Sequence, residues 1–163
     1  MSNKMNLLRD IVIKGSQSLE NITYSEDDDD EFHIIRVKIG KDIYEFKFDS
    51  QQNCCERAFF LSHPGKKYSK KQENTLVFDN SIVGKTISRI SLLYTDSFIN
   101  GVSLNDKDTY IIKVLFINEN NNNDTIYTLI FSNTHNGYYP RELIVNLYEN
   151  NDENPMKIFS TRI

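Results

Sequence analysis

Two short polar segments carry the side chains in this chain that are best suited to chemistry. The first motif, residues 53–57, reads Asn-Cys-Cys-Glu-Arg, and the second motif, residues 135–141, reads His-Asn-Gly-Tyr-Tyr-Pro-Arg. Thiols, a carboxylate and an imidazole are the groups that nucleophilic catalysis uses. Paired tyrosines beside an arginine suit the binding of a planar anionic ligand.

The catalytic interpretation uses both motifs together. Either Cys54 or Cys55 would be the nucleophile, His135 its base and Glu56 the group that orients the base. Adjacent side chains of an extended segment point to opposite faces, so at most one of the two thiols faces a given site. The alternative interpretation is that one cysteine packs as a small buried hydrophobic residue.

The two cysteines do not predict a disulfide or a metal site. Neighbouring residues rarely reach disulfide geometry, so we expect Cys54 and Cys55 to be free thiols. A zinc site that adds His63 and His135 would lack the usual Cys-x2-Cys spacing. We therefore predict no metal and no cofactor.

The binding interpretation rests on the turn chemistry of the second motif. Asn136-Gly137 is a strong turn signal, because both residues tolerate positive φ, and the turn displays two tyrosines. One ring would stack on a ligand and donate from its hydroxyl, or both tyrosines would serve the turn alone. The residues predicted to bind a ligand are Asn53, Glu56, Arg57, Asn136, Tyr138, Tyr139 and Arg141.

The strands that precede the two motifs resemble each other. Residues 43–53 align with 126–136 without a gap, and residues 34–37 match 111–114. A hairpin cannot bury its apolar face alone, whereas two related hairpins share a core. We predict a single domain, 1–163, pseudo-duplicated as 7–60 and 80–148, with a C-terminal hairpin at 142–160. Chance likeness of two alternating hairpins is the alternative.

Alternating apolar residues predict a mainly β protein. Gly40-Lys41 is a turn signal, and in residues 43–49 Glu45 should face solvent. Leu7, Leu8 and Ile11 have helical spacing. We expect a short helix at 3–13, strands at 18–25, 32–39, 43–49, 75–79, 109–117, 125–131, 142–149 and 156–160, and a mobile linker at 118–124. The fold class is α+β only through that helix, with the hairpin units forming one antiparallel sheet, a small barrel or a sandwich.

Composition narrows the function classes. The 163 residues carry a net charge of −4, so general affinity for nucleic acid is not expected. A basic stretch within residues 57–71 would grip phosphate or form a solvated loop. No apolar run is long enough for a membrane span or a signal peptide, and we expect a cytoplasmic protein of a host cell, or one in a virus particle.

The two motifs together resemble an uncharacterised domain family of phages and large viruses. That family carries Gln-Asp-Cys-Cys-Glu and Ser-Asn-Gly-Tyr-Tyr-Ser in this order, and the resemblance covers residues 7–148. It implies a fold and a viral setting but no reaction. The chain departs from the family at Asn53, His135 and Pro140, and it lacks the family's tryptophans.

Three functions remain open from the sequence. The first is a soluble, non-enzymatic viral binding module that presents the two motifs to a nucleotide-like small ligand or to a host or viral protein. The second is a thiol- and histidine-dependent enzyme. The third is a virion structural protein or homo-oligomer, because some strands are apolar on both faces. The residues that motivate it are Leu115, Ile117, Ile126 and Ile130.

Overall fold

The fold was analysed in a computed structural model of the chain. The structure describes residues 5–27, 31–49, 51, 57–65, 67–95, 97–99, 102–103, 109–134, 140–150 and 152–163. Within these residues the chain is all-β apart from two single-turn 3-10 helices, η1 (Lys70–Gln72) and η2 (Glu119–Asn121). No described helix is long and apolar enough to cross a bilayer.

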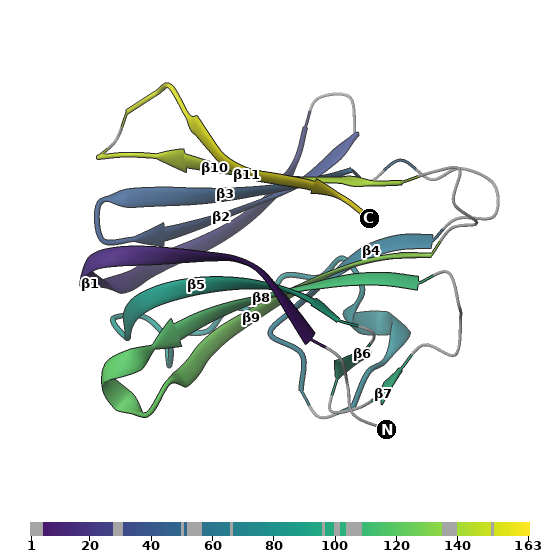
Figure 1. The fold of residues 1–163 in the computed structure, drawn as a ribbon, viewed down its shortest axis with the longest axis horizontal. Helices are drawn as coiled ribbons and strands as arrows, with labels where there is room; N and C mark the ends of the chain where they lie inside the picture. Colours follow the sequence, from purple (N-terminus) through teal and green to yellow (C-terminus); the bar gives the residue numbers. More distant parts are fainter. Residues whose placement is uncertain are drawn as a thin grey trace.

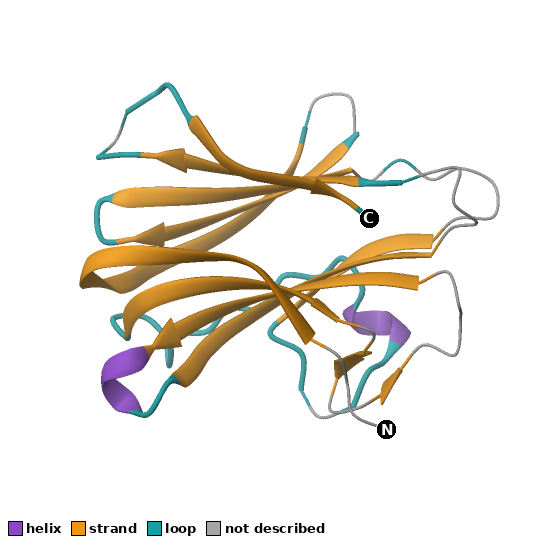
Figure 2. Ribbon diagram, in the orientation of Figure 1, coloured by secondary structure: helices purple, strands orange, loops and turns teal. Residues whose placement is uncertain are grey.

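Nine antiparallel strands form one open sheet in the order β11-β10-β3-β2-β1-β5-β8-β9-β4 (Figures 1 and 2). A separate short pair consists of β6 (Ser97–Ile99) and β7 (Val102–Ser103). The nine are β1 (Met5–Glu26), β2 (Phe32–Ile39), β3 (Asp42–Asp49), β4 (Arg57–Ser62), β5 (Thr86–Thr95), β8 (Thr109–Asn118), β9 (Asp124–Thr134), β10 (Glu142–Tyr148) and β11 (Met156–Arg162).

Strand β1 changes partners along its length and so folds the sheet over. Residues 5–18 pair with β5, and residues 19–26 pair with β2. Gly15 and Ser16, with φ of 72° and 45°, lie just before this change, where the register with β5 shifts between Val12 and Gln17. These left-handed residues bend the strand, since extended strands need negative φ. Figure 1 shows the resulting two layers: β2, β3, β10 and β11 in the first layer, and β4, β5, β8 and β9 in the second.

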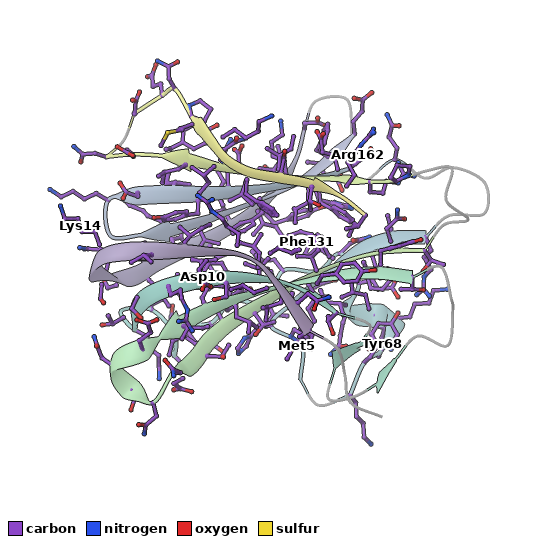
Figure 3. All side chains as sticks on the ribbon, in the orientation of Figure 1. Met5, Asp10, Lys14, Tyr68, Phe131 and Arg162 are labelled. Carbon is purple, nitrogen blue, oxygen red and sulfur yellow. The ribbon has the colours of Figure 1, made fainter. Side chains whose placement is uncertain are left out.

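The core lies between these layers and follows the two-residue period of the strands. Phe46 of β3 meets Phe116 of β8 and Phe131 of β9, with ring centroids 5.9 and 6.3 Å apart. Phe48 lies 5.2 Å from Phe131, which Figure 3 places between the layers. All four rings are fully buried. The apolar side chains at every second position of the strands thus line the inside of the folded sheet.

The predicted N-terminal helix is wrong. Residues 5–13 belong to β1, where Leu7 pairs with Leu93 and Ile11 with Ile90 of β5. The leucines have helical spacing, but the backbone hydrogen bonds to a strand about 80 residues away stabilise the extended conformation more. Propensity is a weak prior that tertiary pairing overrides.

Several strand predictions are confirmed and two local ones are wrong. The hairpin of β2 and β3 turns at Gly40-Lys41 as expected, with φ of 60° at Gly40, and strands are present at 109–117, 125–131, 142–148 and 156–160. Residues 75–79 form no strand. The linker expected at 118–124 connects β8 to β9 through η2 and left-handed Asn122 and Asn123, and its mobility stays a prediction.

The second wrong prediction is that Glu45 faces solvent, because its side chain is 3% exposed. Its carboxylate accepts hydrogen bonds from Arg36 Nε at 2.8 Å and from Asn146 Nδ2 at 3.1 Å. The neighbouring strands β2 and β10 therefore supply polar partners on the outer face, and these partners cover the carboxylate.

Apolar residues on the outer face of the second layer are also covered. Phe59, Leu61, Ile111 and Ile130 form a small separate cluster, against which Tyr68 packs. Ile117 and Ile126 are 5% and 7% exposed. The two-sided apolar strands that suggested an oligomer thus mostly bury their side chains within the chain.

The two hairpins expected from sequence similarity occupy corresponding positions in the sheet. The pair β2–β3 lies between β1 and β10, and the pair β8–β9 lies between β5 and β4. Their registers differ under the sequence match: Val37 is the partner of Tyr44, whereas Phe116, two residues beyond Val114, is the partner of Tyr127. The duplication itself stays a prediction.

Candidate functional site

Both motifs begin and end at one end of the folded sheet, which we call the motif end. The chain leaves β3 at Asp49 and enters β4 at Arg57, and it leaves β9 at Thr134 and enters β10 at Glu142. Arg57 is the cross-strand partner of Thr134, and Phe48 is the partner of Leu143. Each motif therefore connects one layer to the other, and the two connections start and finish on adjacent strands (Figure 1).

An ion pair joins the start of the first connection to the end of the second. Arg141 Nη1 lies 3.2 Å from Asp49 Oδ1, with side-chain exposures of 3% and 23%. The backbone N–H of Arg141 donates to the carbonyl of Ile163 at 2.6 Å, and Asn133 Nδ2 donates to the same oxygen at 2.8 Å. A buried guanidinium with these neighbours is held in a fixed position.

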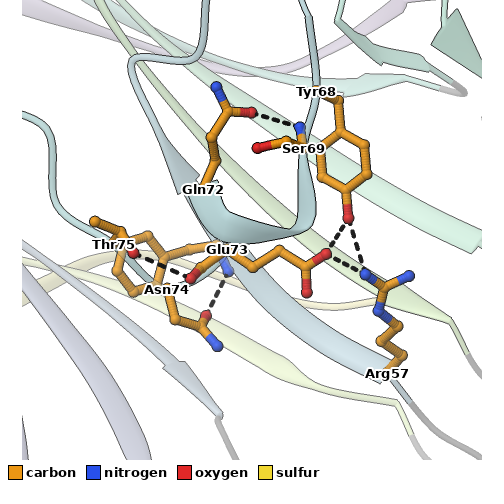
Figure 4. Close-up of polar contacts among 8 residues, drawn as sticks. Arg57, Tyr68, Ser69, Gln72, Glu73, Asn74 and Thr75 are labelled. Carbon is orange, nitrogen blue, oxygen red and sulfur yellow. Dashed lines mark hydrogen bonds and ion pairs between the residues drawn. The ribbon is translucent and has the colours of Figure 1, made fainter.

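The second arginine, Arg57, is fixed by a cluster that follows β4 (Figure 4). Its guanidinium donates to Tyr68 Oη at 2.8 Å and to the carboxylate of Glu73, and Tyr68 also donates to Glu73. The guanidinium carbon lies 5.1 Å from the ring centre of Phe59. Burial and the bond to Glu73 raise the pKa of Tyr68, so its hydroxyl stays protonated.

The remaining predicted site residues fall outside the described residues. They are Asn53, Cys54, Cys55, Glu56, His135, Asn136, Tyr138 and Tyr139. The structure therefore places the two arginines of the predicted binding set and the strand ends that carry both motifs.

His63, considered as a zinc ligand, lies far from Arg57, the last residue of the first motif. Six strand residues run from Arg57 to Ser62, about 20 Å at the rise of a β-strand. Its ring stacks on Tyr127, with centroids 4.9 Å apart, and burial lowers its pKa. Among the described residues, no group of three or more metal-ligating side chains comes together.

Sequence reasoning missed three residues that position the arginines: Asp49, Tyr68 and Glu73. Asp49 ends the strand predicted at 43–49 and Tyr68 lies within the basic stretch of residues 57–71, but neither was singled out by the sequence analysis. A carboxylate at the last position of a strand directly before a motif is a signal that could have found Asp49. Lys67, Lys70 and Lys71 of the basic stretch are exposed, which fits a solvated loop.

The comparisons with known proteins return no relative. No protein-family model, no curated protein and no solved structure matches this chain.

Proposed function

We propose that this protein is a non-enzymatic binding module that takes a small nucleotide-like ligand at the motif end. The observation that carries the proposal is the anchoring of both motifs on adjacent strands, with a positioned arginine at the C-terminal side of each. The ion pair of Arg141 with Asp49 and the pairing of Arg57 with Thr134 define this arrangement. The viral setting implied by the family resemblance is part of the same proposal.

The chemistry of the arginines supports an anionic ligand. A guanidinium presents a planar fork of donors that matches a phosphate, and Glu73 and Tyr68 order the Arg57 fork before any ligand binds. The Arg57 side chain keeps 44% of its surface exposed, so it remains open to solvent. Ordering in advance lowers the entropy lost on binding.

The tyrosines of the second motif would supply the aromatic part of the recognition. Tyr138 and Tyr139 precede Arg141 by two and three residues. A stacked base is worth about 1–3 kcal/mol per ring. A ligand with both a ring and a phosphate would thus use the tyrosines together with the exposed Arg57, while Arg141 holds the end of the second motif in place.

The test is a residue-resolved NMR titration of the full chain with adenosine monophosphate. We expect shifts for the amides around Arg57 and Arg141, and loss of those shifts in a Tyr138→Ala/Tyr139→Ala variant that still unfolds cooperatively. Tyr148→Ala, at the far end of β10, is the matched control and should bind as the unaltered protein does. Equal binding by all three proteins, or no binding at all, would refute the proposal.

The runner-up is a thiol- and histidine-dependent enzyme. The pairing of Arg57 with Thr134 favours it, because Glu56 precedes Arg57 and His135 follows Thr134 in the sequence. An activated cysteine would react with iodoacetamide with a midpoint well below the ordinary thiol pKa of about 8.5. Ordinary reactivity of Cys54 and Cys55 would rule this enzyme out.

A further inference from the structure

A cavity opens at the opposite end of the folded sheet, which we call the turn end. It has a volume of about 410 Å³, within the range of small-molecule sites. Its walls come from the bend of β1, the β2–β3 turn and the segment after β10; in Figure 3 the labelled Lys14 marks this end. The lining residues are Ile13, Lys14, Gln17, Lys41, Asp42, Tyr44 and Asn150.

Tyr44 brings a hydroxyl to the cavity that a ligand could contact. The residue is 5% exposed, yet its hydroxyl has no hydrogen-bond partner among the described residues. The hydroxyl is not among the buried polar atoms of the described residues that lack a partner, so it reaches the open space of the cavity. A hydroxyl that lines a cavity and lacks a protein partner is available to a ligand.

Tyr127 shows the contrast, since it matches Tyr44 in the aligned strands. Its hydroxyl contacts Ser62 Oγ and donates to the carbonyl of Val77 at 2.6 Å. The segment after β4 therefore satisfies Tyr127 from within the chain. At the corresponding place beside Tyr44, the chain leaves a cavity.

The cavity combines cationic, polar and apolar walls. Lys14 and Lys41 are exposed at its rim, whereas Ile13 and Tyr44 are buried at its base. Asp42 accepts the backbone N–H of Asn150 through Oδ1 at 2.9 Å, which fixes the carboxylate at the wall. Burial, with Asp42 and Glu149 nearby, raises the pKa of Tyr44 to about 12, so the hydroxyl is a donor at neutral pH.

The turns around the cavity are held in place. The Gly40 N–H donates to the carbonyl of Ser18 at 2.8 Å, which ties the β2–β3 turn to β1. A side chain at Gly40 would approach Gln17 Oε1 to 2.9 Å, so the glycine lets Gln17 lie against the turn. The cavity is therefore shaped before a ligand arrives.

We propose that the turn end binds a small sugar phosphate. Lys14 and Lys41 would hold the phosphate, and Gln17, Asp42 and the Tyr44 hydroxyl would take the sugar hydroxyls. The apolar face of the sugar would lie on Ile13 and the Tyr44 ring. Two lysines at the rim select a dianion, and a carboxylate at the wall with a phenol at the base selects a polyol.

The experiment is an NMR titration of the full chain with ribose 5-phosphate, inorganic phosphate and ribose as separate probes. Ribose 5-phosphate should bind with a Kd below about 1 mM and shift the amides of Gln17, Lys41 and Asn150. Lys14→Ala/Lys41→Ala should weaken binding at least about tenfold, and Tyr44→Phe about threefold. Lys70→Ala/Lys71→Ala removes the same charge elsewhere and should change Kd less than about twofold.

Three outcomes would overturn this site. They are no binding of ribose 5-phosphate up to about 10 mM, equal binding of inorganic phosphate, and equal weakening by both double-lysine variants. The amides at Arg57 and Arg141 report separately on the motif end in the same spectra. Failure at one end of the molecule is therefore distinguished from failure at the other.

Discussion

Removing one oxygen from each of two buried tyrosines should have unequal effects on stability. Tyr127→Phe deletes the contact with Ser62 Oγ and the donor to the Val77 carbonyl. Tyr44→Phe deletes a hydroxyl that has no partner among the described residues. Both substitutions keep the ring and its packing, so the difference isolates the hydrogen bonds.

The magnitudes follow from the number of bonds lost. Each hydrogen bond contributes about 1 kcal/mol net, but Ser62 Oγ also donates to the Val77 carbonyl at 3.1 Å and keeps it partly satisfied. We expect Tyr127→Phe to lower the free energy of unfolding by about 1.5 kcal/mol and Tm by about 3–6 °C. Tyr44→Phe should change the free energy of unfolding by less than about 0.5 kcal/mol.

Thermal unfolding and urea titration of the three proteins, followed by circular dichroism, measure this difference. Unchanged slopes against urea would show that the variants unfold from the same native state. Equal losses in the two variants, or a larger loss in Tyr44→Phe, would refute the reasoning, because Tyr44 would then have a protein partner.

Two further perturbations test the ends of the sheet. Asp49→Ala removes the carboxylate that pairs with the buried Arg141, so it should lower the free energy of unfolding by about 1–3 kcal/mol in urea titrations. An unchanged urea midpoint would contradict the fixed position of that arginine. Burial lowers the pKa of His33 below its ordinary value of 6.5, so the unfolded chain binds the proton more readily and stability should fall as pH drops below about 6.5. His33→Gln should reduce this loss of stability between about pH 7 and 5, measured by urea unfolding at each pH. The lowered pKa of His63 should leave a smaller dependence of stability on pH, of the same sign. A pH profile identical to that of the unaltered protein would contradict the prediction.

The hairpin of β2 and β3 could be predicted because local signals agree there. Alternation places Ile35 and Phe46 on one face as cross-strand partners, and Gly40 supplies the positive φ of the turn. The first part of β1 could not be predicted in the same way. Its partner β5 is remote in sequence, and the pairing leaves no trace in a local window.

Strand β4 was missed for a different reason. Phe60 faces the core while Phe59 and Leu61 face the cover formed by the segment around Tyr68, so both sides are apolar and no alternation appears. A strand buried on both faces reads as a continuous apolar run, which periodicity does not distinguish from other buried segments.

The residues of the candidate site were also predictable only where a local sequence signal exists. Arg57 and Arg141 were recognisable by residue type beside a turn motif, whereas their partners were not. Asp49 lies 92 residues from Arg141 in the sequence, and Glu73 lies 16 residues from Arg57. Such pairs depend on the strand order, which the sequence pattern did not determine.

Native mass spectrometry of the purified full chain, beside the same sample denatured, tests the central claim most directly. The proposed binding module predicts a small non-covalent mass that leaves on denaturation and is absent from the Tyr138→Ala/Tyr139→Ala variant. A bare mass would contradict it. So would a bound mass that the tyrosine variant keeps and that Lys14→Ala/Lys41→Ala loses, because the ligand would then belong to the turn end.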